Sequence, residues 1–80
     1  MNTTLPIIHI NGTSRETLCL DYDNARIALE DAANAMTKIE FNARDYARGD
    51  WETAVAQRKA MFQKLEEVRD YLMAHAVHCA

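Results

Sequence analysis

The sequence predicts an all-α protein, an antiparallel αα-hairpin with an extended N-terminal arm that oligomerises into a helical bundle. Three observations predict this class. The chain of 80 residues contains only two glycines and one proline, the residues that most often interrupt helices. Two long stretches carry apolar residues at alternating spacings of four and three. A short segment with a glycine, 41–50, separates the two stretches.

Length and composition predict one globular domain, 1–80, because 49% of the residues are hydrophobic and 26% are charged. A chain this short buries only about 60% of its extended surface on folding, so its core is marginal. The net charge of -3 argues against a general nucleic-acid binder and against an anionic membrane surface. No apolar run approaches the roughly 18 residues of a membrane span, and no basic leader precedes one. Cys19 and Cys79 form no disulfide framework, so we expect a reducing, cytoplasmic location.

Residues 1–12 form the predicted arm, since 5–10 is apolar and β-branched and contains Pro6. Such a segment is typical of an extended arm or a short edge strand. Thr13 precedes Glu16 at the spacing of a capping box, which predicts a helix start, with Ser14 as an alternative N-cap.

The first helix is expected over 14–40, where nothing breaks the helical pattern. The segment 21–24 is a poor helix former, so a later start that leaves 17–20 extended is the alternative. The apolar seam of this helix is Leu18, Tyr22, Ala25, Leu29, Ala32, Met36 and Ile39.

The second helix is expected over 51–78, with Asp50 as its N-cap and Glu52 in the first turn. Two helices cannot cover each other completely, so we expect a dimer or higher oligomer. The second seam is Ala54, Arg58, Met61, Leu65, Val68, Leu72 and His75.

Metal binding and catalysis are the less favoured interpretations. His75, His78 and Cys79 lie close together in the sequence, but a histidine-rich last turn also suits the negative end of the helix dipole. Cys19 lies in an apolar run and is expected to be a buried small hydrophobe. We therefore predict no metal, no cofactor and no enzymatic activity.

The segment around the break concentrates arginine and aromatic residues. Arginine binds phosphates bidentately, and tyrosine and tryptophan can stack on a base or fill a pocket of a partner. The alternative is a solvated loop whose aromatic side chains close the end of the bundle. Arg58 occupies a seam position, where its stem packs while its head reaches solvent, or where its charge needs an anion. The candidate residues here are Arg44, Asp45, Tyr46, Arg48, Trp51 and Arg58.

The helix start offers a second candidate element, because backbone N–H groups there can hold an anion. The alternative interpretation is that these residues form only a turn and a helix cap. Helix-rise arithmetic places this end some 35–40 Å from the loop, so a site that uses both elements must form between protomers. The residues are His9, Asn11, Gly12, Thr13 and Ser14.

Two short motifs, Ile8-His9-Ile10-Asn11-Gly12-Thr13-Ser14 and Asn42-Ala43-Arg44-Asp45-Tyr46, give nearly the whole chain a resemblance to small uncharacterised phage and prophage proteins. Those proteins begin with an HLNGTS-type stretch and carry an N-x-R-D-Y-Y-type turn. This chain has Ala47 in place of the second tyrosine, which weakens a double-aromatic platform. The resemblance implies a phage origin and a function in the host cytoplasm.

Two functions remain open. By analogy with other small phage oligomers, the chain is a non-catalytic sponge that sequesters a phosphate-bearing nucleotide signal of host immunity between protomers. Alternatively, it is a protein-binding module that inhibits or adapts a host protein through Tyr46 and Trp51.

Overall fold

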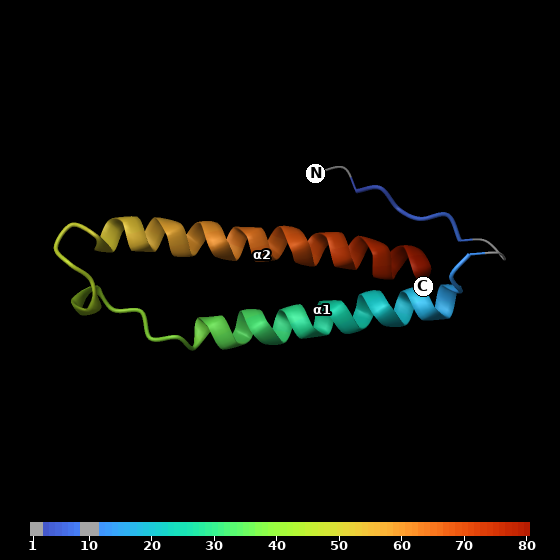
Figure 1. Ribbon diagram of the computed structural model, residues 1–80, viewed down its shortest axis with the longest axis horizontal. Coiled ribbons are helices and arrows are strands. Elements are labelled where there is room, and N and C mark those ends of the chain that lie inside the picture. Colours follow the sequence, from blue (N-terminus) through green and yellow to red (C-terminus); the bar gives the residue numbers. More distant parts are fainter. Residues whose placement is uncertain (1–2, 9–11) are drawn as a thin grey trace.

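The computed structural model describes residues 3–8 and 12–80 and contains two long helices. Helix α1 spans Arg15–Thr37, a short 3-10 helix η1 spans Ala43–Asp45, and helix α2 spans Trp51–Cys79. The described residues include no strand. α1 and α2 pack against each other along their length (Figure 1). The predicted all-helical class with two paired helices is therefore confirmed.

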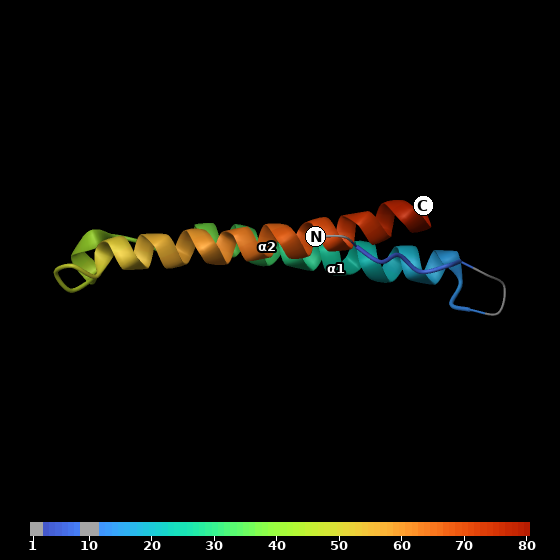
Figure 2. The same ribbon diagram turned by 90° about the horizontal axis from the view of Figure 1, so that it is seen from above.

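The molecule is one thin layer with two distinct ends (Figures 1 and 2). Its principal extents are 60 × 24 × 14 Å. At one end, here called the open end, α1 begins beside the end of α2, and the rings of Tyr22 and His75 stack. At the other, the turn end, Phe41 contacts Trp51 at the start of α2. The 23 residues of α1 separate the two ends by about 35 Å.

α1 begins with the alternative cap. Ser14 is the N-cap, and its Oγ accepts a hydrogen bond from the Thr17 backbone N–H at 3.2 Å. The capping box predicted from Thr13 is therefore wrong, and so is the later start, because α1 runs through 21–24. α1 ends three residues before the predicted 40. There the Thr37 hydroxyl donates to the Asn34 carbonyl, an alternative bond that competes with helix continuation.

The packed stripe of α1 differs from the predicted seam at three of its seven positions. Ala25 and Ala32 are exposed, and Arg26 and Ala33 are half-buried in their place. Leu18, Tyr22, Leu29 and Met36 are half-buried as predicted, whereas Ile39 lies beyond the end of α1 and is exposed. The stripe consists of Leu18, Tyr22, Arg26, Leu29, Ala33 and Met36.

The core that α1 and α2 form is thin, as expected for two helices. Among the described residues only His75 and Cys79 are fully buried, with 2% and 0% of their surface exposed. Met61 and Val68, predicted in the seam of α2, are exposed, while Phe62 packs inward. Neither helix has a segment long and apolar enough to cross a bilayer.

The connecting segment contains the helical turn η1, which the sequence did not predict. Asp50 is the N-cap of α2 as predicted, but its side chain makes no capping hydrogen bond. Gly49 has a φ of +93°, which is strained for any residue with a Cβ, so this position requires glycine.

The described part of the arm, residues 3–8, has neither helix nor strand and runs back beside α2 (Figure 1). The His78 Nε2–H donates to the Pro6 carbonyl oxygen at 2.7 Å. The arm is therefore fixed to the last turns of α2, and the edge-strand alternative is not adopted by 3–8.

Candidate functional site

The turn end is built around three aromatic rings. Phe41 follows α1, Tyr46 follows η1 and Trp51 starts α2. The ring centroid of Phe41 lies 5.7 Å from that of Tyr46 and 4.6 Å from that of Trp51. The centroids of Tyr46 and Trp51 are 5.6 Å apart. These contacts fix the connecting segment against α2, so Tyr46 and Trp51 close this end of the molecule.

Arg58 lies next to this cluster on α2. Its guanidinium carbon is 4.8 Å from the ring centroid of Phe41 and 5.0 Å from that of Phe62. These are cation–π distances, and the side chain is half-buried. No ion pair joins Arg58 to a carboxylate within residues 3–8 and 12–80. The stem therefore packs, as one of the two interpretations predicted, while the guanidinium lies near two aromatic rings and forms no ion pair with the described residues.

A groove with a volume of about 300 Å³ opens beside Arg58. Tyr46 and Arg58 are the two predicted site residues that line it, and Phe41 lines it as well, although it was not among the predicted site residues. The sequence did contain an indication of this role, because Phe41 is an aromatic residue that directly follows the predicted first helix. The groove is lined by Met36, Ile39, Phe41, Tyr46, Ala54, Gln57, Arg58, Met61 and Phe62.

The other predicted residues of this segment lie outside the groove. Arg44 and Asp45 are in η1 and Arg48 follows it; all three are exposed. None of the ion pairs in the described part of the chain involves them. Trp51 is half-buried in the aromatic cluster and does not line the groove. The two arginines add positive charge at the turn end without contributing to the groove wall.

The second predicted element lies at the open end. Gly12, Thr13 and Ser14 are exposed there, and the Ser14 hydroxyl is engaged with Thr17. His9 and Asn11 lie outside the described residues. The structure thus brings Tyr46 and Arg58 together and leaves the helix start at the opposite end of the molecule (Figure 1).

His75 is the centre of the open end. Its ring stacks on Tyr22 at 4.4 Å and contacts Tyr71 at 4.3 Å between ring centroids. The His75 Nδ1–H donates to the Tyr71 carbonyl oxygen at 2.9 Å. Burial raises the pKa of the Tyr22 hydroxyl, and the neighbouring Tyr71 and Cys79 add to the rise. No group of three metal-ligating side chains occurs among the described residues, His75, His78 and Cys79 included.

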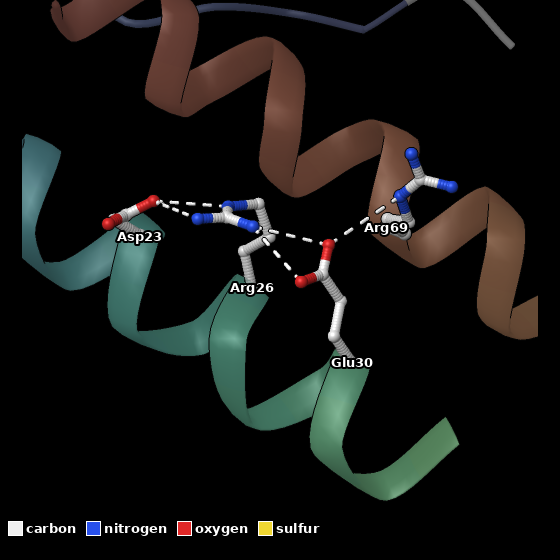
Figure 3. Close-up of polar contacts among 4 residues, drawn as sticks. All are labelled: Asp23, Arg26, Glu30 and Arg69. Atoms are coloured by element: carbon white, nitrogen blue, oxygen red, sulfur yellow. Dashed lines mark hydrogen bonds and ion pairs between the residues drawn. The ribbon is translucent and has the colours of Figure 1, made fainter. Parts of the chain in front are cut away.

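A polar network crosses from α1 to α2 midway along the molecule (Figure 3). Arg26 bonds to Asp23 at 2.8 Å and to both carboxylate oxygens of Glu30, at 3.1 and 3.2 Å. Arg69 of α2 reaches Glu30 at 3.8 Å. The hydrogen bonds to Asp23 raise the pKa of Arg26 above its already high ordinary value. The three- and four-residue spacings of Asp23, Arg26 and Glu30 were a sequence signal for this network.

The turn-end groove combines one cation with apolar and aromatic side chains. A cation flanked by aromatic rings attracts an anion, and the apolar floor accepts a flat ring. Tyr46 and Gln57 add groups that can donate hydrogen bonds to a ligand. Comparison with protein-family models, with curated proteins and with solved structures found no match to this chain.

Proposed function

We propose that this protein is a non-catalytic sponge that sequesters a small phosphate-bearing nucleotide, a signal of host immunity, in a site between protomers. On this proposal the chain is phage-encoded, acts in the host cytoplasm and forms an antiparallel hairpin that oligomerises into a helical bundle. The observation that carries the proposal is Arg58, a half-buried cation with aromatic neighbours and no carboxylate partner in the described chain, on the wall of a groove.

A phosphate of the ligand would supply the missing anion. A half-buried guanidinium is desolvated in part, so a charge-assisted bond to phosphate is stronger there than at a fully exposed arginine. The base of a nucleotide would lie against the exposed Tyr46 ring or the apolar floor of Met36 and Met61.

The site is completed by a second protomer on this proposal. A groove of about 300 Å³ is at the lower end of the size of ligand pockets, so one chain encloses a nucleotide only in part. The start of α1, where residues 12–17 are exposed, lies at the other end of the same chain. A neighbouring protomer in the opposite orientation would place its helix start at this groove.

Thermal unfolding with added cyclic dinucleotides or ADP-ribose derivatives tests the proposal. A ligand at one hundred times its Kd should stabilise the protein by roughly 2.7 kcal/mol. Arg58→Met and Tyr46→Ala should abolish the shift, whereas Lys59→Met, which removes an exposed charge one residue away, should keep it. Recovery of the nucleotide intact after denaturation distinguishes a sponge from an enzyme. The absence of a shift with every compound, in folded protein, would reject the proposal.

A protein-binding function is the alternative, and a different observation favours it. Ile39, Met61 and Val68 are 63%, 44% and 47% exposed, and the first two line the groove. Exposed apolar side chains that continue from a groove are typical of protein-interaction surfaces. A stoichiometric host protein retained by the wild type and lost in Met61→Asp, with no response to nucleotides, would support this function in place of the first.

A further inference from the structure

The two cysteines of the chain come from different helices and lie at the open end. Cys19 is in the second turn of α1 and Cys79 is the last residue of α2. The stacking of Tyr22 on His75 sets the register of the two helices. One helical turn further toward the open end, α1 presents Cys19 and α2 presents Cys79 at the same level.

The surroundings of the two thiols differ in a way that suits stepwise chemistry. Cys79 is fully buried, whereas Cys19 is half-buried and lines a cavity of about 400 Å³ that is open to solvent. Ala76 and Ala80, the neighbours of Cys79 along α2, line the same cavity. Burial raises the pKa of the Cys19 thiol, and the Cys79 thiol beside it raises it further. A reagent in the cavity therefore meets Cys19 first, with the buried Cys79 thiol beside it.

We propose that Cys19 and Cys79 form a reversible disulfide that joins α1 to α2 at the open end. The oxidant is a low-molecular-weight disulfide such as oxidised glutathione. The Cys19 thiolate attacks one sulfur of the reagent, forming a mixed disulfide and releasing one glutathione thiol. The Cys79 thiolate then attacks the Cys19 sulfur and displaces the second glutathione. Two protein thiols become one disulfide, and the reagent takes up the two electrons and two protons.

This bond joins residues sixty positions apart and so constrains almost the whole two-helix unit. A crosslink over such a long loop should raise the melting temperature, on the order of 10 °C. Because the thiolate is the nucleophile, the elevated pKa of Cys19 makes the reaction slow at neutral pH and about tenfold faster for each pH unit above it, up to that pKa.

Incubation of the folded protein in a reduced-to-oxidised glutathione series tests the proposal without any nucleotide. We expect an intact mass lower by two hydrogens, and tryptic peptides 16–26 and 70–80 joined by a bond that dithiothreitol cleaves. The melting temperature should rise with the fraction joined. In Cys79→Ala, Cys19 should stop at the glutathione adduct, with no such rise, and Cys19→Ala should form neither product.

Three results would overturn the proposal. In the first, both thiols remain accessible to alkylation in fully oxidised glutathione. In the second, the wild-type protein accumulates only glutathione adducts. In the third, disulfides form only between chains. Each can occur whether or not the protein binds a nucleotide, so failure here is distinguishable from failure of the proposed function.

Discussion

At the open end, His75 lies between Tyr22 and Tyr71 and is 2% exposed. At the turn end, Arg58 lies between Phe41 and Phe62 and is half-buried. Both are polar groups held by aromatic rings. His75 donates a hydrogen bond to a backbone carbonyl, whereas Arg58 has no carboxylate partner in the described chain. The polar group at the open end is thus hydrogen-bonded within the fold, whereas the charge at the turn end has no carboxylate partner among the described residues; on the proposed function, that charge binds the ligand.

Removing the imidazole should have the largest effect on folding. His75→Ala deletes one of the two buried side chains of residues 3–8 and 12–80 and leaves a cavity between two tyrosines. We expect the free energy of unfolding to fall by roughly 2–4 kcal/mol, measured by urea denaturation. His78→Ala is the matched control, because His78 is exposed and loses one bond to Pro6, which costs about 1 kcal/mol. Equal losses in the two variants would contradict the role assigned to His75.

At the turn end, the backbone of Gly49 is the most sensitive position. Gly49→Ala introduces a Cβ at a φ of +93°, where nothing lies within 4 Å of it, so the cost is backbone strain alone. We expect a loss of about 1–2 kcal/mol in the same denaturation experiment. Ala47→Gly serves as the control for the flexibility of this segment. A stability unchanged by Gly49→Ala would show that the turn relaxes to another conformation.

Alkaline pH should weaken the open end selectively. Burial raises the pKa values of Cys19 and Tyr22, so the folded state favours their neutral forms. The associated stability is fully present below the pKa values of the unfolded chain, about 8.5 and 10, and is lost as pH rises through the folded values. The melting temperature should therefore fall above about pH 9. Tyr22→Phe should reduce this fall more than Tyr46→Phe, and an equal reduction would refute the assignment.

The smallest effect is expected midway between the two ends. Glu30→Gln weakens the bonds to Arg26 and removes the contact with Arg69, whose side chain is 52% exposed. Exposed ion pairs of this kind contribute about 0.5 kcal/mol, and the contribution decreases with salt. Glu66→Gln is the control, since Glu66 forms no ion pair with the described residues. A loss above about 2 kcal/mol would mean that the network, rather than the open end, carries the stability.

Local signals predicted the helices well, and long-range packing explains most of what they missed. The start of α2 followed from residue types at a helix start, whereas at the start of α1 the favoured capping box from Thr13 was wrong and the alternative cap Ser14 is used. The seam was assigned by apolarity, so Arg26 was passed over in favour of Ala25, although its stem packs and its head bonds to Asp23 and Glu30. Cys79 was taken as part of a terminal turn, and its burial depends on the register against α1.

The same distinction applies to the candidate site. Composition indicated arginine and aromatic residues near the turn, and Tyr46 and Arg58 do line one groove. Which arginine faces the groove depends on tertiary structure, since Arg44 and Arg48 are exposed outside it. The contribution of Phe41 arises because the chain reverses immediately after α1, which places that ring over the first turns of α2.

Native mass spectrometry of freshly purified protein, repeated after addition of cyclic dinucleotides and ADP-ribose derivatives, tests directly whether an oligomer of this chain holds a nucleotide. The account predicts an oligomer that retains a phosphate-bearing nucleotide and releases it intact on denaturation. Arg58→Met should remain folded and lose the nucleotide, while Lys59→Met retains it. A folded monomer that binds none of these compounds, or Arg58→Met protein that binds as the wild type does, would contradict the account.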